Sequence, residues 1–248
     1  MNRKLENATN LYMEGIRDGN VRDAVTKYTG RRYTQHSTGV RNGIEGFLEF
    51  FEPFLERCPV RDIRIVRSIV DGQYVFVQAF QDINNGAAKW VTTDLFDTDQ
   101  DDKIIEHWDV IAAFESDPGS EHDQIDGPTE IQDLGSTIEN KEIIRAFMCD
   151  VMVLSQRDKW DTYVDRAALV LHCASDVGAF DEYVGAYNQV FKIIGQGNFV
   201  VAYSRIFRKG QEMARFDLFR LSNGRIEELW VNQELVPPQH EWVNGGKF

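Results

Sequence analysis

A histidine and an aspartate stand two residues apart in the segment Ile104–Val110, whose sequence is Ile-Ile-Glu-His-Trp-Asp-Val. The aliphatic ends and the alternating centre of this segment predict a β-strand. Because successive side chains of a strand point to opposite faces, His107 and Asp109 share one face, and Glu106 and Trp108 share the other. An imidazole beside a carboxylate can act as an acid/base pair. It can equally be a plain surface pair, and the sequence leaves both interpretations open.

The elements before this strand predict an α+β domain. Apolar residues at helical spacing come first and predict helices. A run of predicted strands follows, separated by Asp-Gly, Asn-Asn-Gly and acidic turns. Helices followed by a meander of hairpins indicate an antiparallel sheet rather than a parallel α/β sheet. The expected helices are 3–18, 20–28 and 44–57, and the expected strands are 32–36, 62–70, 74–82, 88–97 and 103–112.

The chain then repeats itself after a polar connector. Residues 115–137 hold seven acidic residues and no Lys or Arg, which is typical of a solvated linker. Beyond it, Leu169–His172 matches the segment that ends at His36, and Arg225–Trp230 matches Lys103–Trp108. The second copy lacks residues where the first has its aromatic helix. We therefore expect a first domain at 1–114, a linker at 115–137 and a second, degenerate domain with a C-terminal tail at 138–248.

Composition narrows the classes of partner and compartment. The net charge of −13 disfavours nucleic acid or an anionic membrane as the main partner. No apolar run approaches the roughly 18 residues of a membrane span, and the first residues lack the apolar core of a secretory signal. The cysteines Cys58, Cys149 and Cys173 have neither metal nor redox spacing. We expect a cytoplasmic protein with reduced thiols.

Several motifs of the first half resemble one known family. Tyr33-Thr-Gln-His36, Gly43-Ile-Glu-Gly46-Phe47, Asp94-Leu-Phe96 and the segment from Lys103 through His-Trp-Asp109 look like the SnoaL-like polyketide cyclases. That family lies in the superfamily of nuclear transport factor two and ketosteroid isomerase. The resemblance covers nearly all of 1–113 and, more weakly, 138–235. It implies that each domain is a curved antiparallel sheet wrapped by N-terminal helices into a cone, and that the tandem copies form an intramolecular pseudo-dimer.

The resemblance also implies a chemistry. Cyclases of this family use a pocket carboxylate as general acid/base for aldol ring closure, and they require no metal or organic cofactor. The matching position here is Asp109, whose pKa we expect burial to raise. His107 would orient that carboxylate or polarise a carbonyl, and His36 would complete a polar cluster at the pocket floor. The residues expected to line the pocket are Asp94, Gln35, Trp90, Phe47, Phe50 and Phe51.

Each of these residues also has a structural interpretation. Asp109 can cap a turn or pair with an arginine, and His107 can be a half-buried structural histidine. His36 and Asp94 recur as His172 and Asp217 in the second copy, and this recurrence suits a role in the fold as well as in a site. The aromatic side chains are typical of an ordinary core and also of the wall of an apolar pocket.

The second copy replaces His107 by Leu229 and Asp109 by Val231, so we expect it to be catalytically silent. The first copy predicts a cofactor-independent cyclase, isomerase or lyase that acts on a small apolar or aromatic molecule carrying a carbonyl. A non-catalytic binding protein on the same scaffold and a hydrolase with an activated water are the alternatives. Little in the sequence supports a protein-interaction module, and a further homodimer stays open.

Overall fold

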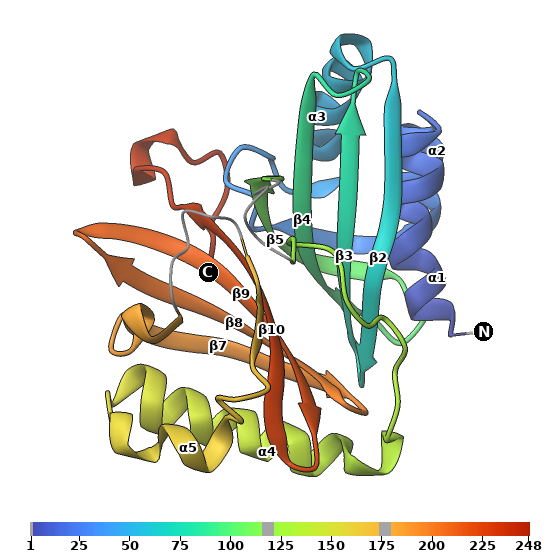
Figure 1. The fold of residues 1–248 in the computed structure, drawn as a ribbon. Helices are drawn as coiled ribbons and strands as arrows, with labels where there is room; N and C mark the ends of the chain where they lie inside the picture. The colour runs from blue at the N-terminus through green and yellow to red at the C-terminus, as the bar shows by residue number, and fades with distance from the viewer. Residues whose placement is uncertain (1, 116–121, 174–179) are drawn as a thin grey trace. The chain divides into compact units, whose positions relative to one another are not determined.

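The computed structural model describes residues 2–115, 122–173 and 180–248 of the chain. These form two compact units, of which the first comprises 1–113 together with 237–248 and the second comprises 114–236. Each unit has its own five-stranded sheet and its own helices (Figure 1). Among the described residues, none of the helices has the length and the apolar character needed to cross a bilayer.

The first unit is a sheet of strand order β1-β5-β4-β3-β2. Strands β2 to β5 form an antiparallel meander, as the hairpin signals predict. Strand β1 pairs with β5 in parallel, because the chain crosses to the far edge through α3 before the meander begins. The sheet is therefore mixed rather than wholly antiparallel. The elements are α1 (Arg3–Asn10), α2 (Val21–Tyr28), β1 (Thr29–Gln35), α3 (Gly43–Arg57), β2 (Arg61–Asp71), β3 (Tyr74–Ile83), β4 (Ala88–Thr98) and β5 (Ile104–Ala113), with a π-helical stretch at Leu11–Arg17 after α1.

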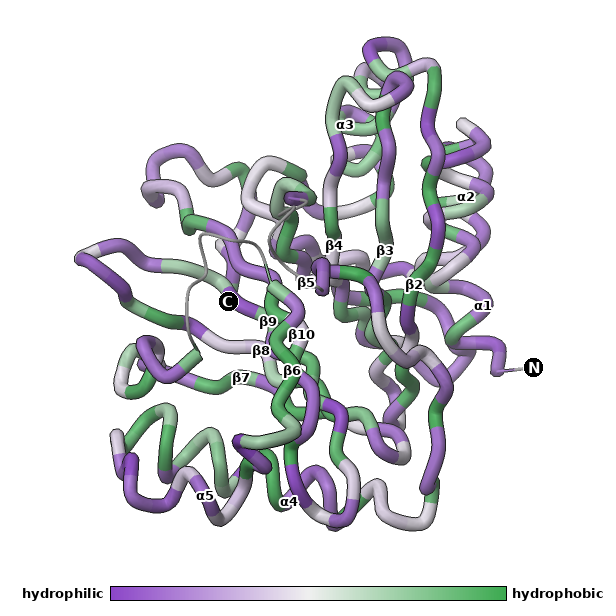
Figure 2. The backbone as a smooth tube through the Cα atoms, in the orientation of Figure 1, coloured by the Kyte–Doolittle hydropathy of each residue, from purple (hydrophilic) through white to green (hydrophobic). Residues whose placement is uncertain are grey.

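The helices of this unit cover one face of the sheet. Hydrophobic residues recur among polar ones along strands such as β2 (Figure 2), so that one face can be buried against helices. The buried core joins Leu11 and Val25 of the helical segments to Phe47 of α3 and to Val77 and Phe96 of the sheet. This packing holds the helices against the strands that carry His107 and Asp109.

The second unit repeats the first. Its strand order is β6-β10-β9-β8-β7, again with a short strand, β6, parallel to the last strand, β10. The predicted tandem repeat of two α+β domains is confirmed by this shared topology. Residues 173–186 take the place of α3 and, where described, contain only the 3-10 turn Phe180–Tyr183. The elements are α4 (Thr137–Phe147), α5 (Trp160–Tyr163), β6 (Val170–His172), β7 (Tyr187–Gln196), β8 (Phe199–Arg208), β9 (Gln211–Ser222) and β10 (Arg225–Leu235).

The C-terminal tail, residues 237–248, belongs to the first unit, although the sequence pattern grouped it with the second domain. Val243 N donates to the carbonyl of Thr38 at 3.0 Å. The Asn244 side-chain amide donates to the carbonyls of Ser37 at 2.6 Å and Val40 at 2.9 Å. No local pattern predicts this placement, because it depends on backbone groups some 200 residues earlier in the chain.

Candidate functional site

A cavity of about 250 Å³ lies in the first unit between the sheet and the helices. Its wall is mainly aromatic and aliphatic, which suits a small apolar molecule. The polar side chains that reach it come from the strands, from the π-helical stretch and, for Ser37, from the segment after β1. The lining residues are Leu11, Tyr12, Ile16, Tyr33, Gln35, Ser37, Val40, Phe47, Phe50, Phe51, Phe54, Gln81, Trp90, Asp94, Phe96, His107, Asp109 and Ile111.

Strand alternation brings most of the predicted residues to this wall. Asp94 on β4 and His107 and Asp109 on β5 point to the same face, since Asp94 is the register partner of Asp109. Gln35 reaches the cavity from the end of β1. Trp90 precedes Asp94 by an even number of residues on β4, so both side chains point to the same face of the sheet. From α3, the helical spacing of Phe47, Phe50 and Phe51 supplies the opposite wall.

His36 is absent from this wall, which corrects its expected place at the pocket floor. Gln35 faces the cavity, so the next side chain must face away from it. His36 instead stacks on Trp108 with ring centroids 4.8 Å apart and bonds Glu106 Oε1 through Nε2 at 2.8 Å. His172, Trp230 and Glu228 repeat this arrangement in the second unit. The recurrence identifies a structural cluster of the fold.

Asp94 and His107 form the central polar pair of the cavity. His107 Nε2 lies 2.8 Å from Asp94 Oδ1, and His107 Nδ1 lies 2.9 Å from Gln35 Oε1. The hydroxyl of Tyr12 donates to the same Asp94 Oδ1 at 2.7 Å. Asp94 is 1% exposed, and its second oxygen, Oδ2, has no hydrogen-bond partner among the described residues. A buried carboxylate oxygen without a partner is costly, so it favours a ligand group at this point.

Burial raises the pKa of the Asp94 carboxyl above its ordinary value of 3.8. The hydrogen bond and charge of His107 oppose that effect without overcoming it, while the charge of Asp109 acts in the same direction as burial. Burial, with the Asp94 charge second, also raises the pKa of Tyr12, which therefore stays a proton donor. Asp94 and His107 can thus share and exchange a proton next to the cavity.

The pKa of Asp109 is lowered, unlike that of Asp94, and this corrects the expected rise of the Asp109 pKa. Burial alone would raise the pKa of this carboxyl, but the charges of Lys247 and His107 hold it below 3.8, helped by hydrogen bonds from Lys247 and Ser37. Lys247 Nζ lies 2.7 Å from Asp109 Oδ1, and both side chains are buried. Asp109 is therefore a fixed anion at neutral pH rather than a proton donor.

Sequence reasoning missed the polar lining residues Tyr12, Tyr33, Ser37 and Gln81, and also Lys247, which pairs with Asp109. Tyr12 and Tyr33 resemble ordinary core aromatics in the sequence, and only the cavity distinguishes them. Lys247 stands next to the last residue of the tail, and nothing in its local sequence points to Asp109.

The equivalent region of the second unit contains a buried ion pair. Asp217 occupies the position of Asp94, and Arg215, two residues before it, occupies that of Thr92. Arg215 Nε lies 2.8 Å from Asp217 Oδ1, and both side chains are fully buried. The hydroxyl of Tyr187 donates to Asp217 Oδ2 at 2.7 Å. Both oxygens of this carboxylate are therefore satisfied, unlike those of Asp94.

Comparison with known proteins places the first half in a family. The model of the SnoaL-like domain matches residues 10–107. Among curated proteins, none matches the sequence. Among solved structures, a protein of Bacillus cereus assigned as a polyketide cyclase is 17% identical, with 44% of this chain and 74% of that chain covered and a TM-score of 0.39.

Two further solved structures are similar to the chain. A protein of Jannaschia assigned as a SnoaL-like polyketide cyclase is 22% identical, with 44% and 85% of the two chains covered and a TM-score of 0.37. An epoxide hydrolase of M. tuberculosis is 14% identical, with 44% and 83% covered and a TM-score of 0.37. The matched residues 10–107 contain most of the cavity wall, including Asp94 and His107. The first domain of this chain is a SnoaL-like domain.

Proposed function

We propose that the first domain binds a small apolar molecule bearing a carbonyl and catalyses proton transfer at the carbon next to it, as in aldol ring closure or isomerisation. One observation carries the proposal: in a mainly apolar cavity, the free oxygen Oδ2 of Asp94 lies on a carboxylate that His107 bonds through Oδ1. A base in such surroundings keeps a pKa closer to the working pH than an exposed aspartate.

The groups of the cavity divide the reaction between them. Asp94 Oδ2 takes the proton from carbon, and the electron pair moves onto the carbonyl oxygen to give an enolate. Tyr33 lines the cavity, and burial raises the pKa of its hydroxyl, so that this group stays protonated. The hydroxyl can donate a hydrogen bond to the enolate oxygen and stabilise it. In ring closure, the enolate carbon attacks a second carbonyl of the same molecule, and the new alkoxide takes up the proton. In isomerisation of a β,γ-unsaturated ketone, the enolate extends over the C=C bond and takes the proton back at the γ-carbon. In either case Asp94 and His107 return the proton.

Asp109 and Lys247 have a supporting role in this proposal. As an ion pair they present little net charge to the cavity, and the anion beside Asp94 raises the pKa of Asp94. This differs from the role that the resemblance suggests for Asp109. The difference follows from Lys247, which the tail brings to the carboxylate.

The test uses β-tetralone, a bicyclic ketone with a fused benzene ring, as the probe. The protein is mixed with it in D2O, and replacement of the α-hydrogens by deuterium is followed by proton NMR. Binding is followed in parallel by tryptophan fluorescence, since Trp90 lines the cavity. The Asp94→Asn variant should retain binding and lose about 100-fold or more of the exchange rate, the usual contribution of a general base.

The matched control is Asp62→Asn, an exposed position on β2 that should leave both readouts unchanged. If the wild type binds the ketone but exchanges its protons no faster than Asp94→Asn, the cavity belongs to a non-catalytic binding protein. If Asp109→Asn rather than Asp94→Asn abolishes exchange, the assignment of the base is wrong.

A further inference from the structure

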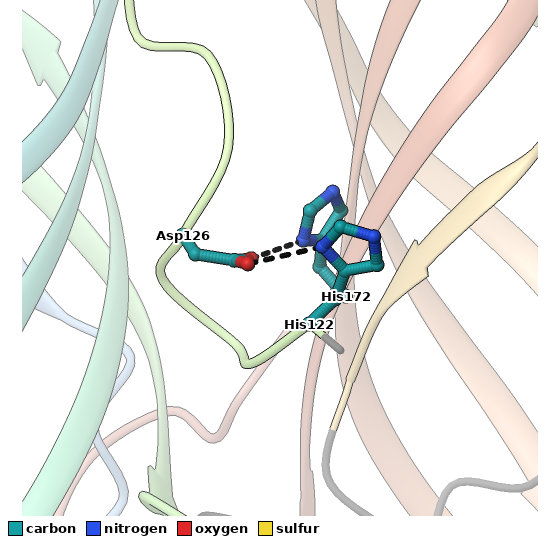
Figure 3. A group of neighbouring side chains, drawn as sticks. All are labelled: His122, Asp126 and His172. Carbon is teal, nitrogen blue, oxygen red and sulfur yellow. Dashed lines mark hydrogen bonds and ion pairs between the residues drawn. The ribbon is translucent and has the colours of Figure 1, made fainter. Parts of the chain in front are cut away.

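A second group of side chains with metal-ligand chemistry lies in the second unit, apart from the cavity. His122 and Asp126 come from the segment that follows the first domain, and His172 ends strand β6 (Figure 3). One ligand atom from each of the three lies within 4.8 Å of the others. The aspartate points between the two imidazoles, so the three donors face a common point.

Hydrogen bonds define this convergence. Asp126 Oδ2 lies 3.1 Å from His122 Nδ1, and Asp126 Oδ1 lies 2.5 Å from His172 Nδ1. One carboxylate thus spans the Nδ1 atoms of two histidines. A cation between these atoms would replace contacts that are now hydrogen bonds by coordinate bonds to the same three groups.

His172 is oriented as a metal-ligating histidine is. Its other nitrogen, Nε2, lies 3.0 Å from Glu228 Oε2, and Glu228 Oε1 is itself held by Arg220 Nε. With Glu228 accepting the Nε2 proton, Nδ1 is the nitrogen that remains for an ion beside Asp126. Trp230 stacks on the imidazole of His172 at a centroid distance of 4.4 Å, and the His172 side chain is only 1% exposed.

The first unit offers an internal comparison. His36 has the same stack on tryptophan and the same glutamate on Nε2. Its Nδ1, however, meets a backbone carbonyl, that of Gly246, at 2.9 Å. The second unit keeps the oriented histidine and adds a carboxylate and a second imidazole where the first unit has a carbonyl. The fold needs only the shared part, so the added pair calls for another explanation.

We propose that His122, Asp126 and His172 bind one divalent transition-metal ion, with Zn²⁺ as the first choice. Two imidazoles and one carboxylate favour zinc, copper or nickel over magnesium or calcium, which prefer oxygen ligands. Three protein ligands leave one position of a tetrahedral ion for water. Exposure of 41% for the His122 side chain and 35% for that of Asp126 gives an ion access from solvent.

The geometry requires a small closure of the site. Bonds of about 2.1 Å place tetrahedral ligand atoms about 3.4 Å apart, compared with the 4.8 Å limit here. His122 makes up the difference by side-chain rotation, since it is the most exposed ligand, while His172 stays fixed. The bound ion ties residues 122–126 to strand β6 and so stabilises the second unit.

The test is metal titration of the full chain after treatment with a chelator. Isothermal calorimetry with Zn²⁺ should give one tight site per chain, and the melting temperature should rise on loading, because an ion that binds only the folded state stabilises it. His122→Gln and Asp126→Asn should each weaken binding by at least about 100-fold, and Glu228→Gln by about 10- to 100-fold, as for an outer partner.

Two controls keep the result specific. His240→Gln removes an exposed histidine outside the group and should bind Zn²⁺ as the wild type does. Titration with Co²⁺ should give the visible bands of a tetrahedral ion without a thiolate-to-cobalt band, which would instead implicate one of the free cysteines Cys58, Cys149 and Cys173. The proposal is overturned by the absence of a tight site, by equal affinity in wild type and His122→Gln, or by a thiolate band.

Discussion

Two carboxylates, Asp94 and Asp109, are neighbours across strands β4 and β5, and their surroundings drive their pKa values apart. Burial raises the pKa of Asp94, whereas the Lys247 charge overcomes burial at Asp109 and lowers its pKa. Such a separation assigns different roles to paired acids. In the proposed function, Asp94 is therefore the group that exchanges protons, and Asp109 is the group that stays charged.

This separation predicts a pH dependence of folding stability. Because the folded chain binds the Asp94 proton more tightly than the unfolded chain does, the contribution of Asp94 to stability is greatest below its ordinary pKa of 3.8 and falls as the pH rises through the window above it. Asp94→Asn removes this loss. Urea denaturation at a series of pH values should therefore show the wild type losing stability relative to Asp94→Asn as the pH increases.

Asp109→Asn provides the opposite sign. The lowered pKa of Asp109 gives stability that is present above 3.8 and is lost as the pH falls through the lower, folded value. Removing this carboxylate should flatten the acid side of the profile. Parallel profiles for the two variants would contradict the assigned directions.

At the scale of elements, the two faces of strand β5 have different roles. The face with His107 and Asp109 lines the cavity, and the face with Glu106 and Trp108 holds His36. The tail adds a third component, because it carries Lys247 to the first face and the Gly246 carbonyl to His36. The C-terminal tail therefore holds a cavity residue in its charged form.

The tail predicts a specific energetic coupling. Lys247→Met leaves Asp109 buried without its partner, which should lower the free energy of unfolding by about 3–5 kcal/mol, the usual result of breaking a buried pair. The double variant Lys247→Met/Asp109→Asn should recover most of that loss. Chemical denaturation of the four proteins in this cycle measures the coupling, and additive effects would show that the pair is not an energetic unit.

At the scale of the molecule, one topology has been used twice with different interiors. The first unit has Thr92 beside Asp94 and a cavity. The second has Arg215 beside Asp217, and the buried guanidinium pairs with the carboxylate. We therefore expect the residue two positions before the shared aspartate to influence whether the interior admits a ligand.

This comparison predicts the effect of a single exchange. Thr92→Arg should place a guanidinium next to Asp94, as in the second unit, and abolish binding of β-tetralone while the chain stays folded. Thr92→Val, which keeps the size of the side chain, should retain binding. Fluorescence titration measures binding and circular dichroism the fold. Full binding by Thr92→Arg would show that the arginine does not close the interior.

Several features follow from the sequence alone. Period-two alternation puts His107 and Asp109 on one face of β5, because the pleat leaves no other choice. The matching segments around Trp108 and Trp230 predict the tandem repeat, because the same pattern of hydrophobic residues gives a strand that buries the same face. The helical spacing of Phe47, Phe50 and Phe51 predicts an apolar wall. Each of these depends on residues close together in the chain.

Other features depend on the tertiary structure. Gln35 and His36 are neighbours on the chain, so their side chains point in opposite directions. Only the folded end of β1 shows that Gln35 faces the cavity and His36 does not. Lys247 changes the charge state of Asp109 from a position 138 residues away, and His172 meets Asp126 across 46 residues. A pKa and a ligand set are properties of neighbours in space. The local pattern determines which way a side chain points, and the folded chain determines what it meets there.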